Sequence, residues 1–369
     1  MPQNRPYLII AQSGRALATS AGRAGIAVHV IDRFADVDTA ALALSCNAVA
    51  GGADRIEGDH LLHLLDGFHG WPLAGIVTGG GLEGCPEILE KIPRYGRLCG
   101  NSARTVRECK DPLRFFTLLD RIGIPHPAIR MQPARAGDWL LKRCGGAGGG
   151  HIRPYLAGEA LPPEHYLQER LEGCPLSVVF IANGIRARIA GFNETWTCAS
   201  AAGDYRYAGA VSIAGDALDC RAELEAVIYR LAEALTLQGL CGLDLVVTGN
   251  DFRILEINPR PTATFELHER DTSLFWAHLR ACEGELVDLP GDDDSRGQQV
   301  CYSGADFTVA PVNWPIWVTD RPTPGRKIAA GEPVCTVQAQ AGSTREVKSL
   351  LAKREREVAA LLGGHRRAA

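Results

Sequence analysis

The sequence predicts an α/β protein that continues into an α+β region, and three stretches of the chain carry this prediction. The first hundred residues alternate short apolar runs with helical patterns, which is typical of a mainly parallel sheet covered by helices. Residues 242–260 have the pattern of two strands joined by a tight turn. Residues 300–337 are rich in strand formers and turn residues, and a helical pattern follows from Arg345 to Leu362.

The length and composition favour two or three domains with apolar cores. The chain has 369 residues, of which 46% are hydrophobic, and its net charge is only -4. A basic run occurs only in the short tail 363–367, so we expect no nucleic-acid partner. No apolar run is long enough to span a bilayer, and residues 1–5 lead into a short strand pattern rather than a signal sequence. We therefore expect a cytoplasmic protein with no membrane partner.

The twelve cysteines do not predict disulfides or a zinc site. They are scattered, the closest two being Cys99 and Cys109, and no CxxC pair exists. Without paired spacing or a secretory signal, we expect reduced cysteines that serve as small apolar side chains.

In the first hundred residues we expect strands at 7–11, 27–31 and 75–78 and helices near 16–24 and 39–44. Loops that follow parallel strands are the usual ligand sites, which makes Ser13–Arg15 and Thr78–Gly84 candidates. The second loop contains GxGxxG, but the acidic residue of a dinucleotide site is absent about twenty residues later. A dinucleotide site is therefore disfavoured.

Asp111 and Pro112 predict a helix start, because Asp is a good N-cap and Pro fits the first helical position. The turn Gly123-Ile124-Pro125 ends that helix. Further on, residues 221–237 have an apolar helical face, and we expect this helix to pack beneath the strands of residues 242–260.

A strand pattern at 139–143 runs directly into the glycine-rich segment 145–150. Glycines allow the backbone to approach phosphate oxygens, and Lys142 at the end of the strand supplies a positive charge. A flexible linker is the alternative, but a strand ending in lysine favours a phosphate-binding lid. The segment lacks GxxxxGK[ST] and so is not a P-loop.

The length of the turn in the strand pair 242–260 determines which residue lies opposite Asp244. With a three-residue turn, Gly249–Asp251, Asp244 lies opposite Glu256. With a two-residue turn, Asp244 lies opposite Leu255 and the acids are solvated. Opposed carboxylates about 5 Å apart repel by about 3 kcal/mol at an effective dielectric constant near 20, and a bound Mg²⁺ reverses that cost.

The spacing of Asp244, Glu256, Asn258 and Arg260 resembles the metal signature of the ATP-grasp superfamily. The chain is most similar to the predicted ATP-dependent carboligases related to biotin carboxylase. The resemblance implies that Asp244, Glu256 and Asn258 hold two magnesium ions, or manganese ions, on the phosphates of ATP. It implies that Lys142 contacts those phosphates and that Arg260 steadies the anionic substrate, both acting in catalysis. The remaining implied nucleotide contacts are Gly145, Gly146, Gly148, Gly149, Gln168, Glu169 and Leu171.

The resemblance also implies a division of the chain into three parts. Residues 1–102 correspond to a Rossmann-like domain that precedes the ATP-grasp domain, 103–290 to the ATP-grasp domain with a lid at about 125–170, and 291–369 to a β-rich segment with a final helix. Two positions depart from the family. Pro112 stands where the family has a nucleotide-contacting lysine. Either Lys110 or Arg114 replaces this contact, or the contact is missing. Pro175 replaces a ribose-binding glutamate, a role left to Glu169 or Glu172.

The implied activity is that of an ATP-dependent carboxylate–amine ligase that forms an acyl phosphate and releases ADP and phosphate. Its partners are then a small carboxylate and an amine, and the resemblance is compatible with a homodimer. The carboligase subgroup is linked with one-carbon carrier cofactors, which suggests addition of an amino acid such as glutamate to a precursor of the methanofuran or methanopterin type. One alternative is a biotin-carboxylase-like enzyme whose biotin arrives on another protein, since the chain lacks Met-Lys-Met. The other is an inactive nucleotide-binding regulatory protein.

Overall fold

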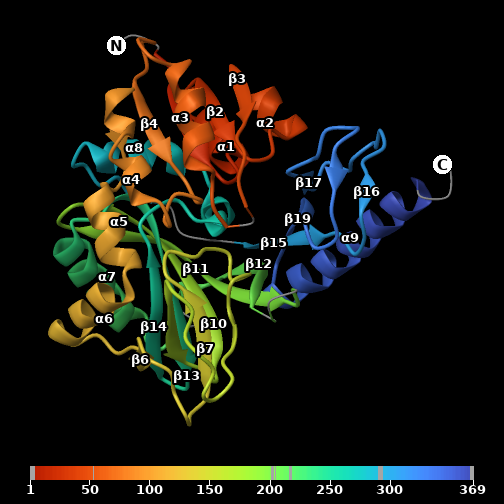
Figure 1. Cartoon of the computed structure of the whole chain (residues 1–369). Coiled ribbons are helices and arrows are strands. Elements are labelled where there is room, and N and C mark those ends of the chain that lie inside the picture. The colour runs from red at the N-terminus through yellow and green to blue at the C-terminus, as the bar shows by residue number, and fades with distance from the viewer. Residues whose placement is uncertain are drawn as a thin grey trace.

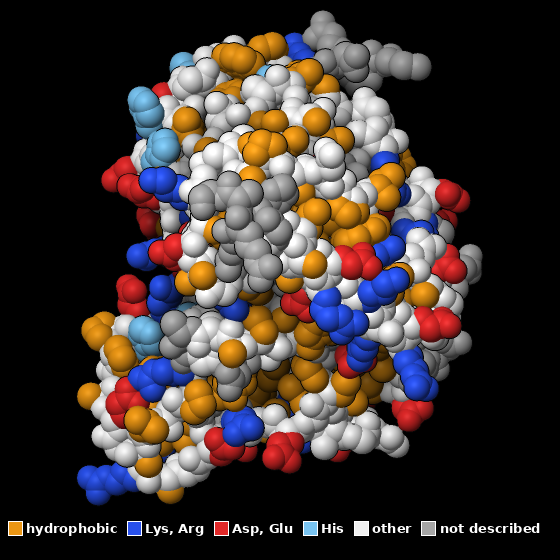
Figure 2. Space-filling model, turned by 90° about the vertical axis from the view of Figure 1, so that its right-hand side faces the viewer, with side chains coloured by type: hydrophobic (Ala, Val, Ile, Leu, Met, Phe, Trp, Pro, Cys, Tyr) orange, Lys and Arg blue, Asp and Glu red, His pale blue; other side chains and the backbone are white. Residues whose placement is uncertain are grey.

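The structure, a computed structural model, describes residues 5–52, 54–200, 203, 205–215, 218–289 and 294–365. The expected boundary at 290/291, the acidic residues Asp292 and Asp293 and the end of the basic tail, 366–367, lie outside these residues. No helix in the described part of the chain combines the length and apolarity needed to cross a membrane. On the face drawn in Figure 2, acidic and basic side chains are interspersed, so that face has no extended basic patch.

The N-terminal part is the expected α/β unit, built on a five-stranded parallel sheet of order β3-β2-β1-β4-β5. Short runs of buried apolar residues form the strands, and amphipathic helices cover both faces. The strands are β1 Tyr7–Ala11, β2 Val28–Asp32, β3 Ser45–Ala48, β4 Gly75–Thr78 and β5 Leu98–Cys99. The helices are α1 Arg15–Arg23, α2 Val37–Leu42, α3 Gly58–Asp66 and α4 Pro86–Leu89, with a 3₁₀ turn, η1, at Ile92–Arg94.

Two consecutive helices, α5 Ala103–Lys110 and α6 Pro112–Arg121, lead out of this unit. The predicted start of α6 is confirmed, because the Asp111 side chain accepts a hydrogen bond from the N–H of Arg114 and Pro112 occupies the first turn. A four-stranded sheet of order β6-β9-β7-β8 follows, and we call it the lid sheet because it occupies the segment where the lid is expected. Its strands are β6 Ile129–Arg130, β7 Trp139–Arg143, β8 Arg153–Pro154 and β9 His165–Glu169.

The central sheet has eight strands in the order β14-β13-β10-β11-β12-β15-β19-β17. It joins the middle of the chain to the C-terminal segment, because β12 pairs with β15 and β15 with β19. The strands are β10 Cys174–Asn183, β11 Ala187–Cys198, β12 Arg206–Ile213, β13 Gln238–Thr248, β14 Asp251–Asn258, β15 Ser295–Tyr302, β17 Val318–Thr319 and β19 Pro333–Ala341. A small pair, β16 Phe307–Thr308 with β18 Lys327–Ile328, and the helix α9 Thr344–His365 complete the C-terminal segment (Figure 1).

Helices cover both faces of the central sheet. As expected, α7, Arg221–Leu235, packs its apolar side chains, including Leu224 and Leu231, in one core with β10, β13 and β14. On the opposite face, the 3₁₀ helix η3, Ala263–His268, and α8, Leu274–Cys282, fill the space between the central sheet and the N-terminal unit. This packing fixes the N-terminal loops over the strand ends that carry the candidate site.

His278 on α8 connects the central sheet to the N-terminal sheet. We expect it to make the stability of the fold sensitive to acid. Its Nδ1 accepts a hydrogen bond from the N–H of Leu240 on β13 at 2.8 Å, and its Nε2 donates to the carbonyl of Cys99 on β5 at 3.1 Å. The contact at Nδ1 requires the neutral ring, and burial lowers the pKa of His278 to about 4. The unfolded chain binds a proton near pH 6.5, so the stabilisation is complete above that pH and is lost as the pH falls toward 4.

We therefore expect up to about 3 kcal/mol of folding free energy to disappear between pH 6.5 and 4 because of His278. Thermal unfolding of the wild type and of His278→Gln across this range measures the effect, since the other titrating groups are common to both proteins. The wild type should lose more stability on acidification. Equal pH dependence in the two proteins would contradict the assignment.

Candidate functional site

The hairpin β13–β14 places Asp244 opposite Glu256, as the sequence predicts, but by a different route. Thr248 pairs with Asp251, so the turn is the two-residue Gly249–Asn250, and the predicted three-residue turn is wrong. A β-bulge between Asp244 and Leu245 inserts Leu255 as an extra residue and restores the pairing of the two acids. The solvated arrangement that a two-residue turn implies is therefore avoided.

The side chain of Gln168 stabilises this bulge and links it to Lys142. Its Nε2 donates to the carbonyl oxygen of Leu255 at 3.1 Å, and its Oε1 accepts a hydrogen bond from the ammonium of Lys142 at 3.0 Å. Lys142 and Gln168 are both buried, and burial lowers the pKa of Lys142. Gln168, an implied nucleotide contact that lines the candidate cavity, uses its amide to position the lysine against the acidic hairpin.

Asp244, Glu256 and Asn258 lie together on one face of the hairpin. The Nδ2 of Asn258 donates to Asp244 Oδ2 at 2.9 Å. Burial and the neighbouring Glu256 raise the pKa of Asp244, whereas Lys110 and Lys142 outweigh burial and hold the pKa of Glu256 below its usual range. The face therefore concentrates negative charge and oxygen atoms.

This face fits a hard divalent cation. The ammonium of Lys110 lies 2.8 Å from Asn258 Oδ1 and 3.4 Å from Glu256 Oε2, so a positive charge is already held between these oxygens. No cluster of three or more His, Cys, Asp and Glu ligands exists in the part of the chain that the structure describes. Two acids and an amide suit Mg²⁺, which keeps several waters and binds phosphate oxygens as its other ligands.

Of the two candidates to replace the lysine lost at Pro112, the structure brings only Lys110 to the hairpin. Lys110 is the last residue of α5 and its side chain is 6% exposed. Arg114 is 56% exposed and pairs with Glu108 and Asp111, away from Asp244 and Glu256.

The glycine-rich segment 145–150 folds against β12. The carbonyl of Gly148 accepts a hydrogen bond from the N–H of Tyr207 at 3.0 Å. Gly149 has a φ of +73°, and a Cβ there would lie 1.9 Å from the carbonyl oxygen of Tyr205. Only glycine fits at this position. Next to the segment, burial lowers the pKa of His151 to about 4, which leaves a neutral imidazole close to Glu256 and Lys142.

A cavity of about 650 Å³ extends between the lid sheet and the central sheet, and most of the predicted site residues line it. They are Lys142, Gly148, Gly149, Gln168, Glu169, Leu171, Asp244, Glu256, Asn258 and Arg260. Gly145 and Gly146 do not line it: Gly145 packs against Gly84 and Gly146 against the ring of His151. The carboxylate of Glu169 accepts the N–H of Ala128 at 3.1 Å.

Arg260 is anchored by Glu83, which the sequence did not single out. The buried carboxylate of Glu83 accepts a hydrogen bond from Arg260 Nε and one from the N–H of Gly81 at 2.6 Å. Despite burial, Arg260 and Lys110 lower the pKa of Glu83. The signal was the loop Thr78–Gly84, a candidate ligand loop by its place after β4. This loop holds Arg260 through Glu83, and its residues Gly79, Gly80 and Gly81 also line the second cavity described below.

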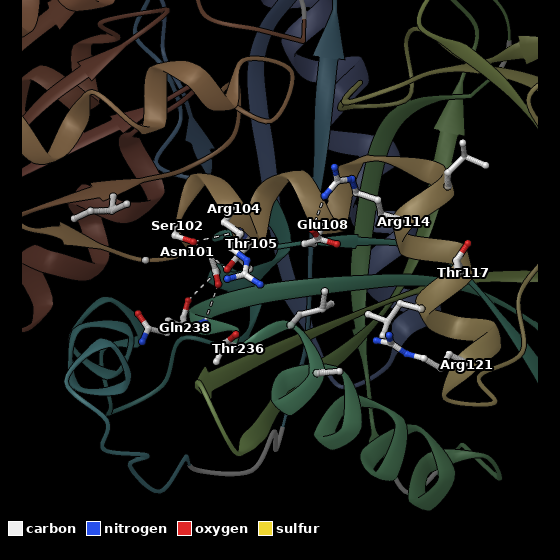
Figure 3. A pocket seen from close by; sticks show the side chains of 16 residues that line it. Asn101, Ser102, Arg104, Thr105, Glu108, Arg114, Thr117, Arg121, Thr236 and Gln238 are labelled. Carbon is white, nitrogen blue, oxygen red and sulfur yellow. Dashed lines mark hydrogen bonds and ion pairs between the residues drawn. The ribbon is translucent and has the colours of Figure 1, made fainter.

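A second cavity of about 310 Å³ adjoins the first. It lies between the N-terminal unit, η3 and the C-terminal strands, and Gly148, Tyr207, Arg260, Thr262 and Ala263 line both cavities. A larger groove of about 990 Å³ runs along α5, α6 and the end of α7 (Figure 3). Arg114 lines that groove, but none of the residues predicted to bind nucleotide or metal or to act in catalysis does.

Comparison with known proteins agrees with this geometry. Residues 109–264 match the family model described as ATP-grasp domain. The large chain of carbamoyl phosphate synthase from Thermus thermophilus is 27% identical over 223 residues, which cover 53% of this chain and 21% of that protein. The chain thus spans about one fifth of the length of this relative.

Two solved structures resemble nearly the whole chain. An L-amino acid ligase from Bacillus licheniformis aligns with a TM-score of 0.69 at 12% identity, over 96% of this chain and 97% of that one. The biotin carboxylase domain of 2-oxoglutarate carboxylase from Hydrogenobacter thermophilus, a dimer solved with MgADP and bicarbonate, aligns with a TM-score of 0.70 at 11% identity, over 91% of this chain and 86% of that one. Residues 109–264 thus match the ATP-grasp domain family, and the chain as a whole has the ATP-grasp fold.

Proposed function

We propose that this protein is an ATP-dependent carboxylate–amine ligase that acts through an acyl phosphate. The observation that carries the proposal is the junction of the two cavities. On one side, Lys142 and the face formed by Asp244, Glu256 and Asn258 suit the triphosphate of ATP with its magnesium. On the other side lies a separate chamber for a small molecule, and Arg260 borders both.

The residues at this junction have the roles that phosphoryl transfer to a carboxylate requires. Asp244, Glu256 and Asn258 would hold magnesium, which would supply neutralisation of the phosphate charge. Lys110 and Lys142 add two ammonium groups on the same side, and the backbone of the glycine-rich segment covers the phosphates. Arg260, oriented by Glu83, faces the carboxylate that receives the phosphoryl group. Catalysis then consists mainly of positioning and charge stabilisation.

The finer substrate assignment rests on the resemblance to the carboligase subgroup. We infer that the acid is an amino acid such as glutamate and that the amine belongs to a one-carbon cofactor precursor of the methanofuran or methanopterin type. The similarity to an L-amino acid ligase over the full length supports an amino acid as one partner. A homodimer stays a prediction.

A panel assay for ADP release tests the ligase function. The protein is incubated with Mg-ATP and combinations of carboxylic acids and amines, with bicarbonate plus free biotin as a separate arm. We expect ADP formation only when an acid and an amine are both present, with an amide as the product. ADP formation dependent on bicarbonate and biotin would instead support the carboxylase. Binding of ATP without turnover on any combination would support the inactive regulatory protein.

A further inference from the structure

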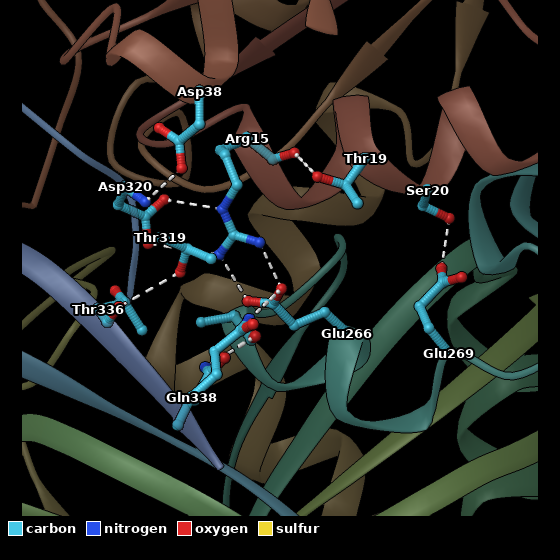
Figure 4. A network of polar contacts seen from close by, with 12 residues as sticks. Arg15, Thr19, Ser20, Asp38, Glu266, Glu269, Thr319, Asp320, Thr336 and Gln338 are labelled. Carbon is cyan, nitrogen blue, oxygen red and sulfur yellow. Dashed lines mark hydrogen bonds and ion pairs between the residues drawn. The ribbon is translucent and has the colours of Figure 1, made fainter. Parts of the chain in front are cut away.

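The charged side chains that line the second cavity indicate which class of substrate binds there. Three arginines line it, and each already has a carboxylate partner. Arg260 is paired with Glu83, and Arg15 is held by Glu266 and by Asp320, with Nε 3.1 Å from Asp320 Oδ1 (Figure 4). Arg326 lies 3.4 Å from Asp36 and over the ring of Phe34. An incoming carboxylate or phosphate would have to compete with these pairs.

Acidic groups are in excess around Asp36. Asp36, 3% exposed, lines the cavity, and Asp32, Asp38 and Asp320 are near enough to act on its charge. Asp32 and Asp38 accept backbone N–H groups, and Arg15 is shared between Asp320 and Glu266. Among the described residues, Asp36 therefore has only Arg326 as a cationic partner, and the nearby Arg321 lies 3.7 Å from Asp38 instead. Burial, Asp320 and Asp32 raise the pKa of Asp36 to about 8, as expected for a carboxylate that lacks sufficient positive charge.

Gln298 gives an independent indication of the ligand. Its side chain is buried, 2% exposed, and lines the same cavity. Nε2 donates to the carbonyl of Ala263 at 2.9 Å and to the hydroxyl of Tyr207 at 3.1 Å. The carbonyl can only accept, so this contact fixes which amide atom is the nitrogen.

The other amide atom, Oε1 of Gln298, has no hydrogen-bond partner among the described residues. A buried acceptor without a donor destabilises the protein, so a ligand N–H group is the complementary partner. Tyr207 and Ala263 border both cavities, which places Gln298 beside the junction where the acyl phosphate would form.

We propose that the second cavity binds the amine substrate, and that this substrate is a primary amine without a carboxylate next to the amino group. The inference rests on the proposed ligase function. Gln298 Oε1 accepts an N–H of the amine, Asp36 and its neighbours favour the incoming ammonium, and the apolar wall, which includes Phe34, Val300 and Val334, receives an apolar body. An α-amino acid would bring a second carboxylate in addition to that of the acid substrate, which Arg260 faces. The other two arginines of the wall, Arg15 and Arg326, are already paired with carboxylates.

The chemical step balances with the groups already named. The ammonium gives one proton to solvent, and the nitrogen lone pair attacks the acyl carbon. The bond from that carbon to the phosphoryl oxygen breaks, phosphate leaves with the bonding electrons, and a second proton passes from nitrogen to the departing phosphate. The product is an amide.

Equilibrium binding of matched probes to the full chain tests this inference without turnover. Isothermal titration compares phenethylamine with phenylalanine and putrescine with ornithine, pairs that differ only by the carboxylate. We expect the amine of at least one pair to bind at least ten times more tightly than its amino acid. Amino acids that bind as tightly as the amines, or no binding by either amine, would overturn the proposal.

Substitutions connect the binding to the named residues. Asp36→Asn and Gln298→Met should each weaken binding of the amine at least tenfold. Asp54→Asn is the matched control, because Asp54 lines the same cavity but its carboxylate is held by Arg143. Unchanged affinity in both test variants would contradict the assignment of these residues.

The two proposals can fail separately. If the amines bind and depend on Asp36 but no acid supports ADP release, the amine site stands and the ligase function fails. If ADP release requires amino acids as the amine partner, the ligase function stands and the amine assignment is wrong.

Discussion

Replacing Glu256 with glutamine is expected to lower ATP-dependent turnover at least about 100-fold, equivalent to about 2.7 kcal/mol of transition-state stabilisation. The substitution keeps the shape of the side chain but removes its charge. It leaves Asp244 and the Asn258 amide as the remaining oxygens of the face, which is too little charge to hold magnesium firmly on a triphosphate. ADP release at saturating Mg-ATP measures the loss.

The fold should survive this change. Glu256 lies at the half-buried face of β14, and its apolar neighbours, Leu243 and Ile257, are untouched. Circular dichroism and the unfolding midpoint should therefore stay close to the wild type. Asp251→Asn at the exposed end of the same hairpin removes an equal charge far from Glu256 and should leave turnover unchanged. Full activity in Glu256→Gln would contradict the proposed metal site.

Replacing Lys110 with methionine is the second change with a large expected effect. Lys110 is buried and donates to Asn258 Oδ1 at 2.8 Å, so it is positioned to exchange this contact for a phosphate oxygen when nucleotide binds. Removing the ammonium should lower kcat/KM for ATP about 100-fold by the loss of one charge-assisted contact to the phosphates. Steady-state kinetics with varied ATP provides the measurement.

Arg114→Met is the matched control for Lys110→Met. Both residues were candidates to replace the family lysine at Pro112, but Arg114 is exposed and directed to Glu108. We expect its kinetics to resemble the wild type. Impaired kinetics in Arg114→Met together with normal kinetics in Lys110→Met would reverse the assignment.

Local sequence patterns were sufficient for the N-terminal parallel unit and for the start of α6. The alternation of apolar runs predicted the parallel unit, and the N-cap at Asp111 predicted the start of α6, because both signals involve neighbouring residues. The pairing of β15 and β19 with the central sheet was not predicted. Strand partners so far apart along the chain are selected by packing of the whole fold, which no short pattern encodes.

In the candidate site, too, some features follow from residues close in the sequence and others from contacts between residues far apart in the sequence. The spacing of Asp244 and Glu256 predicted their opposition, but the bulge that produces it depends on Gln168, which lies 87 residues before Leu255. Glu83 reaches Arg260 from the N-terminal unit. Such partners become visible only when the domains are assembled.

The dependence of ADP binding on magnesium tests the central claim most directly. ADP affinity is measured for the wild type and for Glu256→Gln over a range of Mg²⁺ concentrations, with no substrate present. If Asp244, Glu256 and Asn258 hold the metal on the phosphates, magnesium should tighten ADP binding at least tenfold in the wild type and have little effect in the variant. The same magnesium dependence in both proteins, or none in the wild type, would contradict the claim.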